Sequence, residues 1–479
     1  MEAFVLQALA PHLFFYQRTK GIYPLSLDLR LCCLRILTIL ITHKVTPVVR
    51  SLAPRRKPKS KGYITYHLAN PYANIAPMSY NSLSLKVDII VIGGGIAGLW
   101  AINRLTQLGY QALLIEHQAL GSGQTIKSQG IIHGGLKYAL NGILGLDGAA
   151  IQDMPGRWQA CLKGEGELDL RAVELLSPYQ YLFSTRSLTA QLAQSFAQFT
   201  LQGKVDALNS ADYPNFFQAA AIKGKILRLE EMVLNVPSVI KTLAKLSEPY
   251  LLKIDRLTEN SWLRNQAQEL EGLELQNGQQ RLKLLADCIL MTAGSGNAEM
   301  LQCFPSPTPR MQHRPLQMSV AKFSEPYEVF AHCMDGQSAP RLTITTHRTE
   351  AGETVWYLGG RLAEEGVQRS QSEQIKATEL ELKTLFPNMP FSNLSCSAFR
   401  VDRAEAWQHD GKKPALPTLY EMEKIIIAWP TKLAFAPLLA DLIIDSLTKK
   451  NILPTHRAMD LTALQTWPKP LIAKPLWEE

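Results

Sequence analysis

The clearest hydrophobic pattern begins near residue 87. Residues 87–92 read VDIIVI, a largely apolar run of strand-forming residues. A run without polar alternation is typical of a parallel strand that is buried on both faces of its sheet. A helical pattern follows, and its apolar positions fall on one side: Ala97, Trp100, Ala101, Leu105 and Leu108. We expect Gly109 to end this helix and a second strand to cover residues 112–115.

More strands are predicted in the second half of the chain. Residues 272–275 and 280–284 flank Asn277-Gly278, a dipeptide that favours a tight hairpin turn. Residues 287–291 read as the next strand. Four later segments also have strand character: residues 317–323, 327–334, 341–347 and 354–360. Polar and apolar residues alternate in the stretch RLTITT, which indicates a sheet with one face in water.

The turn after residues 87–92 carries a dinucleotide-binding signature. The pattern G-x-G-x-x-G is formed by Gly93, Gly94, Gly95, Ile96, Ala97 and Gly98. Its first glycine allows a tight turn, its second lets the backbone approach a pyrophosphate, and its third lets the helix pack closely on the strand. The pyrophosphate would lie at the helix N-terminus, where N–H groups and the dipole favour an anion. Glu116 stands 18 residues after Gly98, where an acid accepts hydrogen bonds from ribose hydroxyls.

The residues after Glu116 favour FAD over NAD. They include GSGQT at residues 121–125 and SQGIIHGG at residues 128–135, two stretches rich in small residues. A simple NAD domain would continue directly into another helix, whereas glycines let a backbone approach a flat, buried ligand. Further cofactor-binding residues are predicted here: His117, Ser122, Gly123, Gln129 and Gly130. His133 is a candidate acid or base, or a flavin contact, and the alternative is a hydrogen-bonded structural histidine.

Three segments of the chain are similar to one family of flavoproteins. DIIVIGGGIAGLWAINRL, LGSGQT with IIHGGLKY, and ADCILMTAGSGN resemble the D-amino-acid-oxidase-like group, which includes glycine oxidase, sarcosine oxidase and glycerol-3-phosphate dehydrogenase. The stretch IIHGGLKY is particularly similar to glycerol-3-phosphate dehydrogenases, and the resemblance covers roughly residues 86–445. It implies an α/β fold, with a discontinuous Rossmann-type FAD-binding domain and an antiparallel β-sheet substrate domain.

The resemblance also implies where the chain meets the flavin. Gly294 would return the chain to the nucleotide, and the antiparallel sheet would cover the flavin. Residues 424–428 read as a last strand, and WPTKLAFAP leads from it into a helix with Pro437 in its first turn. In the family this helix begins beside N1 and the C2 carbonyl of the flavin, where a cation stabilises the reduced ring, and Lys432 is the candidate. Relatives carry glycines where this chain has WPT, so the substrate class stays open.

These expectations divide the chain into four parts. The predicted boundaries are a leader at residues 1–78, an FAD-binding domain at 84–165, 226–300 and 396–450, a substrate domain at 166–225 and 301–395, and a C-terminal tail at 451–479.

The leader differs from the rest of the chain in charge. Residues 1–77 hold 11 of the 50 basic residues and two of the 42 acidic residues. The remainder therefore holds 39 basic and 40 acidic residues, a net charge of −1. We expect residues 1–78 to be an extension outside the fold, with Met78 where an initiator would stand. The apolar residues 31–42 are interrupted by Arg35 and are shorter than the roughly 20 residues of a membrane span. A membrane-surface anchor and a targeting segment are the alternatives.

The remaining candidates are two arginines and a small set of possible pocket residues. Arg400 and Arg403 could bind a carboxylate or phosphate through the guanidinium fork, and the alternative is a surface ion pair with Asp402 or Glu405. Candidates for the pocket lining are His313, Arg314 and Arg361. The seven cysteines form no C-x-x-C and the ten histidines show no H-x-x-x-H spacing, so we predict a reducing compartment, no redox disulfide and no metal.

We therefore predict an FAD-dependent oxidoreductase. A hydride would pass from a C–H bond beside an amine or hydroxyl of a small amino acid, N-methyl amine or polyol phosphate to flavin N5, and oxygen or a quinone would accept the electrons. The alternatives are an FAD-binding protein without turnover and a flavoenzyme acting on tRNA. The near-neutral main body argues against a nucleic-acid partner. We expect a cytoplasmic location, with peripheral membrane contact through the leader as the alternative.

Overall fold

The structure is a computed structural model of the chain. It describes residues 83–134, 153–184, 205–222, 224–305, 309–335, 337 and 339–478. The predicted leader at residues 1–78 lies outside these described residues. Within the described ranges, no helix is long and apolar enough to cross a membrane.

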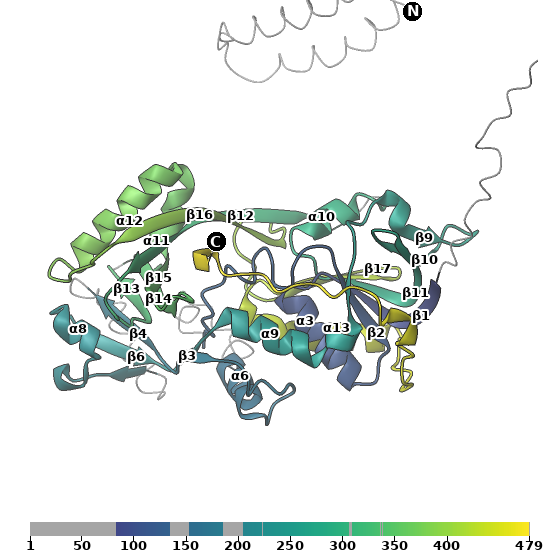
Figure 1. Cartoon of the computed structure of the whole chain (residues 1–479), viewed down its shortest axis with the longest axis horizontal. Helices are drawn as coiled ribbons and strands as arrows, with labels where there is room; N and C mark the ends of the chain where they lie inside the picture. The colour runs from purple at the N-terminus through teal and green to yellow at the C-terminus, as the bar shows by residue number, and fades with distance from the viewer. Residues whose placement is uncertain are drawn as a thin grey trace, which may run out of the picture. The chain divides into compact units, whose positions relative to one another are not determined.

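The first sheet contains the predicted strand–helix–strand unit (Figure 1). Its strands are β1 (Leu83–Ile92), β2 (Ala112–Glu116), β8 (Leu251–Lys253), β9 (Trp262–Arg264), β10 (Leu270–Asn277), β11 (Gln280–Met291), β17 (Thr418–Met422) and β18 (Ile425–Trp429). The order β18-β11-β1-β2-β8 is parallel throughout, and β17 is an antiparallel edge. β10 and β11 form the antiparallel hairpin predicted around Asn277-Gly278.

Burial on both faces explains the apolar run in β1. Ile89 faces a core formed with helices α3 (Ile96–Gln107), α9 (Val236–Leu246) and α13 (Ala436–Lys449). Ile90 faces a second core that includes residues of β9, β10 and the C-terminal tail. Gly109 has a φ of +88°, a conformation that favours glycine, so α3 ends where the sequence predicts.

The second sheet has the order β16-β12-β15-β14-β13-β4-β6-β5. Its strands are β4 (Gln180–Ser184), β5 (Val205–Ala207), β6 (Ile226–Leu229), β12 (Met311–Phe323), β13 (Ala331–Met334), β14 (Leu342–Arg348), β15 (Thr354–Gly359) and β16 (Ser395–Ala406). All neighbouring pairs are antiparallel except β13 and β4, which are parallel. The sheet is therefore antiparallel apart from one pairing.

Two strands pair with a different sheet from the one that the predicted domain boundaries imply. The predictions assigned residues 226–300 and 396–450 to the FAD-binding domain, but β6 and β16 pair within the second sheet. Both strands extend the sheet by backbone pairing with partners distant in sequence, which local patterns do not reveal. We propose boundaries that place β6 and β16 with the second sheet.

Smaller elements cover the two sheets. β3 (Leu175–Ser177) and β7 (Val233–Leu234) form a separate two-stranded ribbon. The short helices are α6 (Met154–Lys163), α8 (Asn215–Ala219), α10 (Gly296–Leu301) and α11 (Arg361–Glu365), and the longer α12 (Gln371–Leu385) packs along β16.

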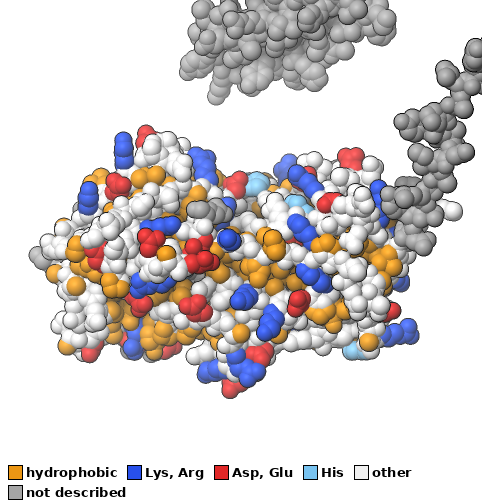
Figure 2. Space-filling model, in the orientation of Figure 1, with side chains coloured by type: hydrophobic (Ala, Val, Ile, Leu, Met, Phe, Trp, Pro, Cys, Tyr) orange, Lys and Arg blue, Asp and Glu red, His pale blue; other side chains and the backbone are white. Residues whose placement is uncertain are grey.

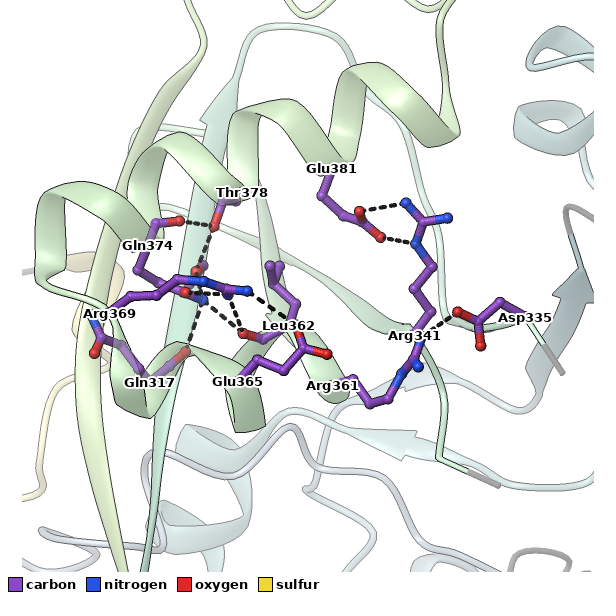
Figure 3. Close-up of polar contacts among 11 residues, drawn as sticks. Gln317, Asp335, Arg341, Arg361, Leu362, Glu365, Arg369, Gln374, Thr378 and Glu381 are labelled. Atoms are coloured by element: carbon purple, nitrogen blue, oxygen red, sulfur yellow. Dashed lines mark hydrogen bonds and ion pairs between the residues drawn. The ribbon is translucent and has the colours of Figure 1, made fainter. Parts of the chain in front are cut away.

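A buried polar network holds α12 against the second sheet (Figure 3). Gln374 is fully buried, and its Nε2 donates to the backbone oxygens of Gln317 at 3.1 Å and Leu362 at 3.0 Å. Arg369 Nη1 donates to Gln374 Oε1 at 3.0 Å, so both ends of the amide are used. Thr378, one turn along α12, donates to the hydroxyl of a buried serine on β12 at 2.8 Å. The network fixes the helix on the face of the sheet that carries Gln317.

The C-terminal residues after α13 join the two sheets and are part of the fold (Figure 1). Leu120 N–H donates to Leu471 O at 2.7 Å, beside the predicted cofactor loop. Farther along, the ring of Trp477 stacks on His347 of the second sheet, with ring centroids 4.4 Å apart. Burial lowers the pKa of His347 to about 3, so this imidazole is neutral at physiological pH.

Replacing Gln374 with Ala should lower the free energy of unfolding by about 2–3 kcal/mol, because buried carbonyls lose their donor. Lys376→Ala, on the exposed side of the same helix, should change it by less than about 0.5 kcal/mol. Denaturant unfolding of both variants measures the difference. Equal stability of the two variants would show that the network does not hold α12 in place.

Candidate functional site

Close packing at the β1–α3 turn leaves no room for two side chains. A Cβ atom on Gly98 would lie 1.9 Å from the carbonyl oxygen of Gly93. Gly93 has a φ of +104°, and a Cβ atom there would lie 2.7 Å from Ala293 Cα. Thr292 Oγ1 donates to Gly93 O at 3.1 Å, which links the end of β11 to the same turn. The first and third glycines of the signature are therefore required by packing.

Gly95 in this turn and Gly123 in the following segment have few neighbouring atoms. A Cβ atom on Gly95 would meet only Thr125 Oγ1, at 3.3 Å, and one on Gly123 would meet nothing within 4 Å. Ile96 N–H donates to Thr125 Oγ1 at 3.0 Å. The next N–H groups of the first turn, beginning with Ala97, have no partner within the helix. This open, donor-rich turn fits a pyrophosphate.

Glu116 is held at the end of β2 with its carboxylate against the glycine turn. The residue is buried, and its Oε2 accepts a hydrogen bond from Gly94 N–H at 2.7 Å. Its Oε1 accepts from Gln118 N–H at 2.6 Å. These bonds fix the carboxylate at the position where the signature expects a ribose. His117 is half-exposed, with Nδ1 3.4 Å from Glu116 Oε1, so it lies at the rim of this site.

The small-residue segment (residues 121–134) runs from this turn over the second sheet. Gln129 Nε2 donates to Tyr357 O at 2.9 Å, and a Cβ atom on Gly359 would lie 2.7 Å from Gln129 Oε1. The Gln129 side chain therefore joins the segment to the sheet. Gly130 has a φ of +73°, and its Cβ would lie 2.1 Å from Leu234 O. Gly130 has no room for a side chain because it packs against β7. Ser122 lies in the turn near Gly123.

Strand register defines the row of residues beneath this segment. Gly359 pairs with Thr343, and Thr343 pairs with His332. A Cβ atom on Gly359 would lie 3.2 Å from the Met318 side chain. Met318, Gly359, Thr343 and His332 therefore share one face of the second sheet. The structure thus places the predicted cofactor segment directly on one face of the predicted substrate domain.

The loop before α13 has an unusual backbone. Lys432 N–H donates to Pro430 O at 2.6 Å, which makes a three-residue turn with Thr431 at its centre. Thr431 has a φ of +62°, a conformation that favours glycine. Thr431 Oγ1 donates to Leu416 O at 3.0 Å and helps to hold the turn. Gly294, with a φ of +58°, accepts a hydrogen bond from Trp429 Nε1 at 3.3 Å, so the ends of β11 and β18 meet here.

Four cations gather near the junction of β12, β16 and this loop. Arg403 Nε donates to Arg314 O at 3.0 Å, and burial together with the charge of Arg314 lowers the pKa of Arg403 to about 10. Burial and the charge of Lys432 hold the pKa of Lys413 well below its ordinary value. The buried carboxylate of Glu405 forms a bidentate ion pair with Arg314, at 2.8 and 2.9 Å.

Two carboxylates favour the charged form of Arg403. Glu405 has the larger effect on the pKa of Arg403, and Glu364 on α11 has a smaller one. Arg314 and Met318 are four residues apart on β12, so they share a face of the strand. Arg314 and its cross-strand partner Arg403 therefore lie on the face that carries the small-residue segment, and they suit an anionic ligand.

The structure separates Arg400 from Arg403, although the sequence suggested both for one site. Arg400 pairs with Gln317 across the strands, whereas Arg403 pairs with Arg314. A separation of three residues puts the two side chains on opposite faces of β16. Arg400 is exposed and donates to the backbone oxygen of Val367 at 2.9 Å. Strand alternation therefore turns Arg400 away from the face that carries Arg403.

His133 meets two partners that the sequence did not suggest. Its Nδ1 lies 3.0 Å from Oε2 of the buried Glu231, and its ring stacks on His332 with centroids 6.1 Å apart. Gly134 N–H donates to Glu231 Oε1 at 2.9 Å. Burial alone would raise the pKa of Glu231, but the charge and hydrogen bond of His133, with smaller effects from His332 and Gly134, lower it to about 2.

Several site residues carry no local signal. Lys413 lies in a polar loop, Glu231 lies between two short strands, and His332 alternates with apolar residues in a buried strand. Only the fold brings Lys413, Glu231 and His332 beside residues that the sequence analysis predicted for the site. Of the other pocket candidates, Arg361 forms an ion pair with Asp335, and His313 is half-exposed with Nδ1 3.5 Å from Asp402.

Charges of both signs are interspersed on the surface shown in Figure 2. That face of the described residues carries no extended patch of Lys and Arg. This distribution agrees with the near-neutral charge of the chain after residue 77.

Comparison with known proteins identifies related sequences and folds. The family model described as FAD dependent oxidoreductase matches residues 88–408. A probable FAD-dependent oxidoreductase of Pseudomonas aeruginosa, PA4991, is 41% identical over 396 residues, which cover 82% of this chain and 98% of that protein. The crystal structure of PA4991 has a TM-score of 0.70 to this chain at 38% identity, and covers 83% of this chain and 98% of its own.

More distant structures share the fold. Glycine oxidase from Geobacillus kaustophilus has a TM-score of 0.56 at 13% identity, over 78% of this chain and 100% of its own. An L-α-glycerophosphate oxidase from Mycoplasma pneumoniae has a TM-score of 0.54 at 10% identity, over 82% and 98% respectively. The predicted resemblance and the predicted fold class are confirmed.

Replacing Gly95 with Val should abolish retention of FAD, because the new side chain would enter the space left for the pyrophosphate. Gly156→Val is the control, since this glycine also has open space around it but lies on α6, outside the turn. The flavin absorbance per chain after gel filtration measures retention. Normal flavin content in the Gly95 variant would refute the position assigned to the pyrophosphate.

Proposed function

The chain belongs to the family of FAD-dependent oxidoreductases, and we propose that it oxidises a small molecule that carries an anionic group. The substrate class is an amino acid, another amine with a carboxylate, or a polyol phosphate. When bound, FAD supplies an acceptor for a hydride at N5. The chain's own residues would hold the substrate, orient its C–H bond and exclude water.

The observation that carries this proposal is the cationic cluster formed by Arg314, Arg403, Lys413 and Lys432. Burial and neighbouring positive charges lower the pKa of both Arg403 and Lys413, so keeping these two side chains charged here is costly. A carboxylate or phosphate ligand would stabilise their charged forms. Its binding would restore the depressed pKa values of the Arg403 and Lys413 side chains toward their ordinary range.

Arg403 and Lys432 suit separate tasks. Arg403 presents a planar fork that matches a carboxylate or phosphate, and its Nε is anchored on the backbone oxygen of Arg314. Lys432 immediately precedes the turn that leads into α13. The positive end of the α13 dipole and the charge of Lys432 would both stabilise negative charge on a reduced flavin.

The two alternatives from sequence analysis remain separate hypotheses. An FAD-binding protein without turnover would bind flavin that no small anion reduces. A flavoenzyme acting on tRNA would need a basic surface, and the face of the molecule in Figure 2 supplies none. Oxygen or a quinone is proposed as the final electron acceptor.

Anaerobic spectroscopy of the purified chain tests the proposal. Amino acids, N-methyl amino acids and glycerol phosphates would be added in turn, each beside a neutral ester or alcohol of the same size. Bleaching of the flavin spectrum by an anionic compound, and not by its neutral counterpart, is the expected result. A flavin that none of the anions bleaches would favour the alternative without turnover.

Replacing Arg403 with Ala should reduce kcat/KM for the substrate by about 100-fold, equivalent to about 3 kcal/mol, because one charged partner of the anion is lost. Arg403→Lys should recover part of the loss, since it keeps the charge but not the fork. Arg400→Ala should have little effect, because Arg400 lies on the opposite face of β16. Equal losses for the Arg400 and Arg403 variants would contradict this geometry.

Replacing Lys432 with Ala should lower the midpoint potential of the bound flavin by about 30 mV, equivalent to about 1.4 kcal/mol for two electrons. The physical reason is that a positive charge near the flavin stabilises its reduced form. Lys449→Ala removes the same charge from the other end of α13 and should leave the potential unchanged. Spectroelectrochemical titration measures both values, and an unshifted potential in the Lys432 variant would remove this residue from the site.

A further inference from the structure

Two imidazoles and a carboxylate converge where the small-residue segment lies on the second sheet. His133 belongs to the segment, Glu231 lies between β6 and β7, and His332 lies on β13. One ligand atom from each of these residues lies within 4.8 Å of the other two. Glu231 and His332 are buried, and His133 is partly exposed. The sequence predicted no metal, because the three residues are far apart along the chain.

Groups outside the trio orient Glu231 and His332. Glu231 Oε1 accepts a hydrogen bond from Gly134 N–H at 2.9 Å. His332 Nδ1 lies 2.9 Å from Thr343 Oγ1. Metal-binding histidines and carboxylates typically have such outer contacts, which fix the ring orientation and the free carboxylate oxygen.

The charge of the group favours a cation. The Glu231 side chain is 7% exposed, and its Oε2 lies 3.0 Å from His133 Nδ1. A buried carboxylate needs a positive partner, which is either a protonated imidazole or a metal ion. Two neutral imidazoles and one carboxylate are suitable ligands for a divalent transition metal.

A fourth buried polar group provides an independent indication of a ligand. Gln180 is fully buried on β4, and neither its Nε2 nor its Oε1 has a hydrogen-bond partner among the residues that the structure describes. Leu182 pairs with His332, so strand alternation puts Gln180 on the same face of the sheet as His332. Gln180 also pairs with Leu229, two residues before Glu231. An unsatisfied amide at this place fits an ordered water, such as one bound to a metal.

We propose that His133, Glu231 and His332 bind a divalent transition metal ion, with zinc or ferrous iron as the class of ion expected. The ion would tie the small-residue segment to β13 and would leave positions for water near Gln180. This site is separate from the cationic cluster and does not depend on the substrate class proposed above. A bound ion would occupy the lone pair of His133, so His133 would then not serve as a proton acceptor.

The test uses the full chain with FAD bound. After treatment with a chelator and removal of the chelator, the protein is titrated with Co²⁺, whose visible d–d absorption reports nitrogen and oxygen ligands. We expect one equivalent to bind per chain, to be displaced by Zn²⁺ and to raise the thermal midpoint. Elemental analysis of the untreated protein should find a transition metal.

Variants locate the bound ion. Glu231→Gln keeps the size of the side chain but removes its charge, and His332→Gln removes one ligand; each should weaken Co²⁺ binding by about 100-fold or more. His313→Gln removes a half-exposed histidine outside the group and should bind as the wild-type chain does. Circular dichroism and flavin content establish that each variant is folded.

Two results would overturn the proposal. The first is a wild-type titration without a stoichiometric d–d signal, which would leave the trio as a hydrogen-bonded acid–base group. The second is equal Co²⁺ affinity in the wild-type chain and in both the Glu231 and His332 variants, which would place the ion elsewhere. The wild-type titration decides the first point even if a variant fails to fold.

Discussion

The contact between Gly98 and the carbonyl of Gly93 is the constraint on which the rest of the site depends. Because a Cβ atom would lie only 1.9 Å from that oxygen, α3 can begin at this distance from β1 only with glycine at position 98. The approach directs the first turn of α3 and the carboxylate of Glu116 toward one open space. The end of β11, through Thr292, is fastened to the same turn. One short approach therefore positions the N–H donors of α3, the carboxylate of Glu116 and the end of β11 around the same turn.

Several hydrogen bonds and ring contacts connect the two sheets. Gln129 donates to the backbone of β15, and Tyr357 donates to the backbone of the small-residue segment at 2.7 Å. The C-terminal residues bind beside Leu120 and reach the second sheet at Trp477. The cofactor side and the proposed substrate side are thus linked at several points. This linkage allows the Arg403 cluster to keep a fixed position relative to the β1–α3 turn.

Buried charge distinguishes the two functional hypotheses of the second sheet. The cluster around Arg403 contains buried cationic side chains and suits an anion, whereas the trio around Glu231 combines a buried carboxylate with two imidazoles and suits a metal ion. Arg403 and His332 lie on the face of the sheet that meets the small-residue segment. Because burying charged groups is costly, each cluster is more informative than a surface ion pair of the same composition.

The sequence by itself determined the β1–α3–β2 unit, the hairpin and the FAD-dependent family, because glycine spacing, apolar runs and turn residues act over short distances. Only the tertiary structure decided which polar residues meet. Arg400 and Arg403 are three residues apart but lie on opposite faces of β16, while Glu231 and His332 approach from distant segments. Strand register and side-chain alternation set these contacts, and both depend on partners that are remote in sequence.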